Sequence, residues 1–308
     1  MSDLAALRRS PTAEIESDDA PPAFWLRAAD GAASFLFVLC SWFFAPTILP
    51  TNHRPTPGQL VALPDPPSGV PRSIFVKDPT HNEHFLSDDD STVPGCLLQV
   101  LLVGQLVLIV AFAHFVRREA HIALPMYCWA VGLTELLTEL LKNYVGRLRP
   151  QFYEACGWDE TNHTCTWDPA RMPDPALVPD EEHHSFPSGH SSLTTCAGLM
   201  LTMYALGVLP AVQPRHRLGQ QCVGRLLTPL ALMPTALAMF VAASRVRDNW
   251  HFPSDVIAGI VLGGACSVVV YQRYLAVPSA RPGYRKVDVT PEGSGAQAEE
   301  EGYYCRLA

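Results

Sequence analysis

The chain has 308 residues, of which 48% are hydrophobic and only 17% are charged, and its formal net charge is −8. Ordinary soluble domains carry about 25% charged residues, so the composition favours a membrane protein. The acidic balance argues against a nucleic-acid partner, because no basic stripe is present to neutralise phosphate backbones. The cysteines show no CxxC pair and no zinc-type spacing, so we expect neither a metal site nor a cofactor.

Six apolar segments are long enough to cross a bilayer, which takes about 17–25 helical residues. They run over 32–49, 96–116, 122–141, 191–212, 226–243 and 256–275. They predict an all-α, polytopic membrane protein whose six transmembrane helices form one bundle over residues 29–276. The polar ends, 1–28 and 277–308, are expected to be disordered cytosolic segments.

Lysine and arginine in the short connections predict the orientation. Arg117, Arg215 and Arg281 follow the second, fourth and sixth segments, so these ends and both termini are assigned to the cytosol. The loops 51–94 and 151–187 then lie on the non-cytosolic side. The chain is expected in the plasma membrane or in an endomembrane such as the ER or Golgi, and the sequence leaves the choice open.

The loop 151–187 carries two features typical of a lumenal or extracellular location. Asn162 begins an Asn-His-Thr sequon for N-glycosylation. Cys156 and Cys165 are a possible disulfide pair in an oxidising compartment. Each feature also arises by chance, so they support the predicted orientation without fixing it.

Three polar clusters interrupt the apolar pattern, and the predicted topology places all of them at the non-cytosolic ends of helices. They are residues 142–150 (KNYVGRLRP), 186–190 (FPSGH) and 244–255 (SRVRDNWHFPSD). We expect the third cluster to link the fifth and sixth helices. All three therefore belong to one membrane surface.

The charged and capping residues of these clusters suit a phosphate group. Lys142, Arg149 and Arg245 supply point charges and forked guanidinium donors. Ser188 and Gly189 stand where the fourth helix begins, so their backbone N–H groups and the helix dipole favour an anion. Three fixed cations can neutralise a phosphoryl group as a metal does elsewhere, so the sequence predicts a metal-free phosphate site.

Two histidines supply the chemistry of this predicted site. His251 and Asp255 are four residues apart, a spacing that would place the carboxylate beside the imidazole and fix its tautomer. His251 could then attack phosphorus through its other nitrogen. His190, from a different helix, could protonate the departing alkoxide.

Several residues keep more than one interpretation. Glu135 and Glu139 lie inside the third helix, where a functional role is possible, but a position facing the bundle interior, with Glu139 near Lys142, is favoured. His183 and His184 could join His190 in a metal site, although no further ligand is suitably spaced. Cys305 near the C-terminus resembles a prenylation site, and an unmodified tail is the simpler alternative.

Together the clusters resemble the signature motifs of the type-2 phosphatidic acid phosphatase superfamily, K-x6-RP, PSGH and SR-x5-H-x3-D. Every motif position is filled, by Lys142, Arg149, Pro150, Pro187, Ser188, Gly189, His190, Ser244, Arg245, His251 and Asp255. The six expected helices and the loop lengths are similar to the eukaryotic lipid phosphate phosphatase branch.

This resemblance implies a role for each residue. His251 would be the nucleophile, Asp255 would orient it and His190 would be the general acid. The phosphate would be held by Lys142, Arg149, Ser188, Gly189 and Arg245. The implied substrates are phosphatidate, lysophosphatidate, sphingosine 1-phosphate, ceramide 1-phosphate and possibly diacylglycerol pyrophosphate, cleaved without metal through a phosphohistidine.

The main alternative is a catalytically inactive membrane interaction protein of the same architecture. Because none of the motif residues is replaced, the enzyme is favoured. The expected partners are the bilayer and a lipid phosphate, with a homo-oligomer possible. The preferred lipid tail is left open.

Overall fold

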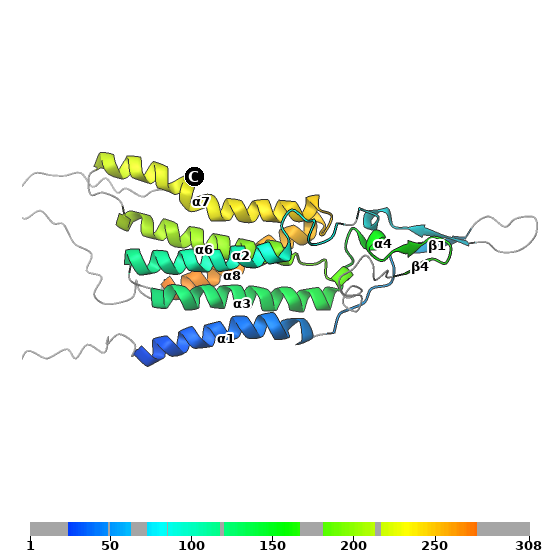
Figure 1. Cartoon of the computed structure of the whole chain (residues 1–308), viewed down its shortest axis with the longest axis horizontal. Helices are drawn as coiled ribbons and strands as arrows, with labels where there is room; N and C mark the ends of the chain where they lie inside the picture. The colour runs from blue at the N-terminus through cyan, green and yellow to red at the C-terminus, as the bar shows by residue number, and fades with distance from the viewer. Residues whose placement is uncertain are drawn as a thin grey trace, which may run out of the picture.

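The computed structural model describes residues 24–48, 50–62, 73–84, 86–117, 120–166, 181–212 and 217–275. Within these residues six helices are long and apolar enough to cross a membrane. They lie side by side in one bundle (Figure 1), which confirms the predicted all-α architecture. The tail 277–308, with Cys305, and most of the segment 1–28 lie outside the described residues.

The membrane helices are α1 (Phe24–Ile48), α2 (Gly95–Phe112), α3 (Ala120–Val145), α6 (Gly189–Val212), α7 (Arg217–Arg247) and α8 (Pro253–Leu275). A π-helical turn, η2 (Ala113–Arg117), continues α2. Helix α1 begins inside the segment expected to be disordered, and α7 extends beyond its expected range at both ends. Hydropathy finds the part of a helix that lies in hydrocarbon, whereas backbone hydrogen bonding continues past it into the polar interface.

Helix α6 lies at the centre of the bundle and packs against α2, α3, α7 and α8, while α1 packs against α3. Glycines of α8 allow the closest of these approaches. A Cβ atom at Gly259 would lie 2.6 Å from the carbonyl oxygen of Ser188, and one at Gly263 would overlap the carbonyl of Ser192. The close fit of α8 on α6 fixes the start of α8 beside the start of α6.

The loops form a small cap at the end of the bundle where α3 ends and α6 begins, which we call the motif end (Figure 1). The cap holds two short antiparallel hairpins that the sequence analysis did not predict, β1 (Gly58–Ala62) with β2 (Ser73–Lys77) and β3 (Trp158–Asp159) with β4 (Thr164–Cys165). It also holds a 3₁₀ turn, η1 (Pro79–His81), and the short helix α4 (Phe152–Ala155).

Candidate active site

The first motif begins in the last turn of α3, where Lys142 lies. The helix ends at Val145 because Gly146 adopts φ +58°, a left-handed conformation that favours glycine. The chain after α1 caps this end. The amide of Asn52 donates to the carbonyl of Asn143 at 2.9 Å, and Nε of Arg54 donates to that of Val145 at 2.9 Å. These bonds satisfy carbonyls that a helix end leaves free, and the chain turns back across the motif end.

The second motif opens α6, with Ser188 as its N-cap residue. The Ser188 hydroxyl accepts a bond from the amide of Ser191 at 3.4 Å. The sequence analysis expected the amides of both Ser188 and Gly189 to face an anion, but the Ser188 amide donates to the carbonyl of Asp255 at 3.0 Å. Of the groups expected to face an anion, the amide of Gly189 and the dipole of α6 remain. The Cβ position of Gly189 lies only 3.2 Å from Nζ of Lys142, so a larger residue would crowd this cation.

The third motif spans the end of α7 and the start of α8. Ser244 and Arg245 lie inside the last turn of α7 and not in a linking loop, as was expected. The chain then folds back, and the amides of Trp250 and His251 both donate to the carbonyl of Arg245, at 3.1 and 3.3 Å. This turn brings His251 over the end of α7, and α8 begins at Pro253.

Main-chain hydrogen bonds join the first motif to the segment before α6. The amide of Ser185 donates to the carbonyl of Arg147, and the amide of Arg149 to the carbonyl of Glu182, both at 3.0 Å. The Arg149 guanidinium also stacks on the ring of Trp250, with 4.5 Å from Cζ to the centroid. The structure therefore brings both histidines and all three cations to the same end of the bundle.

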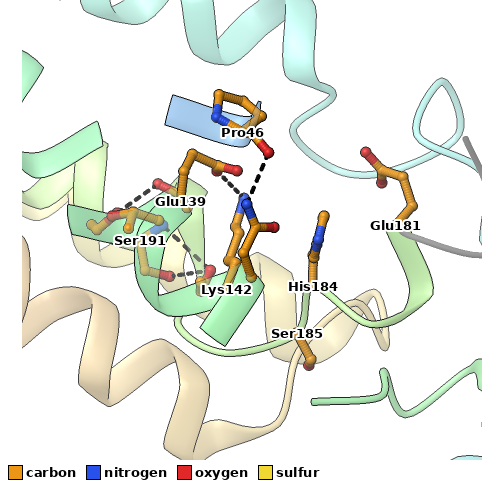
Figure 2. Close-up of polar contacts among 12 residues, drawn as sticks. Pro46, Glu139, Lys142, Glu181, His184, Ser185 and Ser191 are labelled. Atoms are coloured by element: carbon orange, nitrogen blue, oxygen red, sulfur yellow. Dashed lines mark hydrogen bonds and ion pairs between the residues drawn. The ribbon is translucent and has the colours of Figure 1, made fainter. Parts of the chain in front are cut away.

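Each of these three cations has a carboxylate of its own. Nζ of Lys142 lies 2.6 Å from Glu139 (Figure 2), and Nη2 of Arg149 lies 3.3 Å from Glu181. Nη2 of Arg245 lies 3.2 Å from Asp248. Because a buried charge without a partner is costly, these carboxylates allow the cations to lie in the protein before a ligand arrives.

His251 is buried, and its imidazole is held by the main chain. Its Nδ1 atom lies 2.7 Å from the carbonyl oxygen of Ser185. A carbonyl oxygen can only accept, so Nδ1 carries the proton and Nε2 has a free lone pair. Burial, followed by the charges of Arg149 and Lys142, lowers the pKa of His251 well below its usual value. The neutral, nucleophilic tautomer is therefore the stable one.

The direct contact expected between Asp255 and His251 is wrong. Among the described residues, the Asp255 carboxylate accepts from Arg147 Nη1 at 2.5 Å, from the Ser185 hydroxyl at 2.6 Å and from the Phe252 amide at 3.1 Å. The two residues are four apart in the sequence, but only Asp255 lies in α8, which begins at Pro253, so the spacing does not place both side chains on one helix face. Asp255 is the third residue of that helix and reaches back to the amide before it, as in a capping box. Ser185 therefore links the two residues, with its hydroxyl bonded to Asp255 and its carbonyl to His251.

Of the residues at the defined motif positions, two carry a buried polar atom without a partner in the described part of the chain. His190 is hydrogen-bonded to the main chain of Val93, which leaves its Nε2 without a partner. Nη1 of Arg245 is also unpaired, although the Arg245 side chain is fully buried. Buried polar atoms are nearly always hydrogen-bonded, so these two point to a ligand that brings its own acceptors.

Sequence reasoning missed Arg147, Ser185 and Asp248. Asp248 accepts from the amide of Thr92 and from its hydroxyl, both at 2.8 Å, while it pairs with Arg245. It thereby ties the third motif to the segment before α2. Its position three residues after Arg245, inside the SR-x5-H motif, was the available signal. Ser185 and Arg147 gave none, because their roles depend on contacts between distant segments.

The remaining candidates lie around this site or in the cap. His184 lies between Lys142 and Glu181 (Figure 2), and burial, followed by the charge of Lys142, lowers its pKa to about 4. The metal site considered for His183, His184 and His190 is wrong for the described residues, where no three potential ligands are grouped for a metal.

In the cap, Cys156 and Cys165 are joined by a disulfide across the β3–β4 hairpin. Asn162 is exposed in the turn of this hairpin, where an attached glycan would meet no packed neighbour. Its glycosylation stays a prediction.

Known proteins that are similar in sequence indicate the family of the chain. The sequence profile of the PAP2 superfamily matches residues 123–277. Lipid phosphate phosphatase 2 of Arabidopsis thaliana is 27% identical over 218 residues, covering 67% of this chain and 72% of the relative. Lipid phosphate phosphatase 1 of the same plant is 29% identical over 199 residues, covering 63% and 58%.

Phospholipid phosphatase 2 of Rattus norvegicus is 30% identical over 159 residues, covering 48% of this chain and 52% of the rat protein. The chain thus spans little more than half the length of two of these relatives. No solved structure matches the chain. The profile covers half of the chain and includes all three motif clusters, so the chain belongs to the PAP2 superfamily, in its eukaryotic lipid phosphate phosphatase branch.

Proposed function

We propose that the protein hydrolyses lipid phosphomonoesters without metal, through a phosphohistidine at His251. The observation that carries this proposal is that two histidines lie at one cluster of cations. Nε2 of His251 keeps a lone pair, and Nε2 of His190 has no partner among the described residues. The names of the relatives indicate lipid phosphates as the substrate class. The proposed substrates are phosphatidate, lysophosphatidate, sphingosine 1-phosphate, ceramide 1-phosphate and possibly diacylglycerol pyrophosphate.

In the first step, Nε2 of His251 attacks phosphorus and the bond from phosphorus to the lipid oxygen breaks. His190 gives its Nε2 proton to the departing oxygen, which leaves as an alcohol. Lys142, Arg149 and Arg245 neutralise the equatorial oxygens, as phosphoryl transfer requires. The unpaired Nη1 of Arg245 donates to one of them.

In the second step, water attacks the phosphohistidine, and the bond from phosphorus to Nε2 breaks. His190, now neutral, accepts a proton from this water. Inorganic phosphate leaves, and both histidines return to their starting states. One water is consumed for each alcohol and phosphate released, so the cycle balances without a further reactant.

The proposed orientation places the motif end in the lumen or outside the cell. The disulfide of the cap supports it, because such bonds persist in oxidising compartments. The exposed sequon at Asn162 fits the same side. Glycosidase treatment of protein expressed in eukaryotic cells tests this orientation, since a mobility shift lost in Asn162→Gln requires a lumenal cap.

Phosphate release by detergent-solubilised protein, with EDTA present, tests the proposed function. The wild type should release phosphate from at least one of the five substrates, and His251→Ala should not. His163→Ala, which removes an exposed histidine of the cap hairpin, is the matched control and should keep full activity. No release from any substrate by well-folded wild type would favour the inactive interaction protein.

A further inference from the structure

A groove of about 440 Å³ lies between α1, α2 and α3 within the membrane-spanning part of the bundle. Its walls are mostly aliphatic and aromatic and include Trp42 of α1, Leu102 and Leu106 of α2, and Val131 of α3. Both α1 and α2 pack against α3, which forms the floor. The groove therefore offers an apolar, elongated space to something that lies in the bilayer.

The groove begins near the motif end and runs toward the middle of the membrane. On α2 it runs from Gln99 to Leu106, and these residues lie about 6 and 16 Å along the helix from Gly95 at the motif end. On α1 the groove residue nearest the motif end is Phe43, which lies about one turn further from that end than Pro46. The carbonyl of Pro46 accepts from the side chain of Asn143, next to Lys142, at 2.9 Å. Since half of the hydrocarbon core is about 15 Å thick, the α2 wall of the groove lies in the leaflet nearest the candidate active site. The α3 floor, at Val131 and Tyr127, lies about 16 and 22 Å from Lys142, near the middle of the membrane.

One face of α3 connects the groove with the phosphate-binding cations. Val131, Glu135 and Lys142 are four and seven residues apart, which places them on the same side of the helix. Along this face, from the motif end inward, Lys142 comes first. The buried carboxyl group of Glu135 lies about 10 Å deeper than Lys142, and Val131 of the groove lies about 16 Å deeper than Lys142. A lipid phosphate has the same order of parts: phosphate, polar backbone, hydrocarbon chain.

We propose that the groove receives the hydrocarbon chain of the substrate while its phosphate is bound at Lys142, so that the groove sets the preference for long-chain substrates. This inference rests on the proposed function. A freely exchanging membrane lipid could also occupy the groove. Only if the substrate's own chain binds there should blocking the groove lower the rate of hydrolysis of long-chain substrates. Chain-length dependence of the kinetics is therefore the distinguishing property.

The test fills the groove with a tryptophan at an exposed position, so that folding is preserved. Val103→Trp places the ring in the groove, and Val261→Trp, on α8 outside it, is the matched control. Both valines lie eight residues from the motif end of their helices and are similarly exposed, at 60% and 64%. Leu39→Trp, on the α1 wall, is a second variant. The readout is kcat/KM for octadecyl phosphate and for hexyl phosphate, whose chain is too short to reach the depth of Val103 and Leu39.

We expect Val103→Trp and Leu39→Trp to lower kcat/KM for octadecyl phosphate about tenfold, the effect of losing about two buried methylene groups. Hexyl phosphate should be hydrolysed at the wild-type rate, and Val261→Trp should change neither substrate. The inference would be overturned if Val261→Trp lowered kcat/KM as much as the groove variants did. It would also be overturned if the groove variants lowered kcat/KM equally for both substrates, or left it unchanged for octadecyl phosphate. Hydrolysis of neither substrate by the wild type would instead contradict the proposed function.

Discussion

The Nδ1 atom of His251 donates to the main-chain carbonyl of Ser185 at 2.7 Å, so a backbone group, not a carboxylate, sets the tautomer of the candidate nucleophile. Asp255 lies one residue further out, where its carboxylate accepts a hydrogen bond from the Ser185 hydroxyl. Where an aspartate contacts the catalytic histidine directly, replacing it with asparagine costs about 10⁴ in kcat. Here the carbonyl remains, so Asp255→Asn should lower kcat only about 10- to 100-fold.

Ser185→Ala provides the companion measurement for this relay. It removes the hydroxyl that bonds to Asp255 but keeps the carbonyl that holds His251. If Asp255 acts through this hydroxyl, the double variant should be no slower than Asp255→Asn alone. A 10⁴-fold loss in Asp255→Asn, with Ser185→Ala unaffected, would show that the carboxylate contacts His251 during turnover.

Asp248 should determine how well Arg245 binds phosphate. Asp248→Asn removes the charge that fixes Nη2 of Arg245, so we expect the Ki of inorganic phosphate, measured as a competitive inhibitor, to rise about tenfold or more. Thr92→Val is the matched control, because it removes one bond from Asp248 and leaves the pair with Arg245 intact. Equal Ki values for Asp248→Asn and wild type would show that Arg245 needs no partner.

Gly146 should be essential for the geometry of the first motif. Its φ of +58° costs about 1–2 kcal/mol for a residue with a side chain, and its Cβ would overlap the carbonyl of Asn52. Gly146→Ala should therefore lower both the melting temperature in detergent and kcat. Gly104→Ala in α2, where a Cβ meets nothing within 4 Å, should not destabilise the protein. Similar melting temperatures for the two variants would contradict the observed turn.

Glu182 should make the stability depend on pH. Burial raises its pKa from 4.5 to about 7, so the native state keeps the carboxyl protonated where the unfolded chain has lost the proton. This stabilisation is complete below pH 4.5 and is lost as pH rises through 7, by on the order of 3 kcal/mol. Glu182→Gln should therefore reduce the fall in melting temperature between pH 5 and pH 8. The exposed Glu83→Gln is the control, and an unchanged fall in Glu182→Gln would contradict the shift.

The bundle, and the gathering of the motif residues at one end of it, could be predicted from the sequence because both follow local rules. Apolar runs of bilayer length identify helices whatever they pack against. Lys142, His190 and His251 were recognised by motif spacing, and the helix ends that carry them meet because all of them belong to one side of the membrane.

The network around these residues could not be predicted, because it depends on contacts between distant segments. The helix start at Pro253 decided that Asp255 turns toward Ser185 and Arg147 instead of His251. The pairing of Asp248 with Thr92 joins residues far apart in the chain. The cap hairpins were missed because their strands are short and lie in polar loops.

The central claim is that the phosphoryl group passes through His251, and trapping it there is the most direct test. p-Nitrophenyl phosphate needs no proton on its leaving group, so His190→Ala should still be phosphorylated by it but should lose the phosphate slowly, since His190 also activates water. In His190→Ala, mass spectrometry after rapid quenching should find an acid-labile phosphate on the peptide that contains His251. The double variant that combines His190→Ala and His251→Ala should carry no phosphate on this peptide. Phosphate on another residue, or turnover by His251→Ala, would contradict the account.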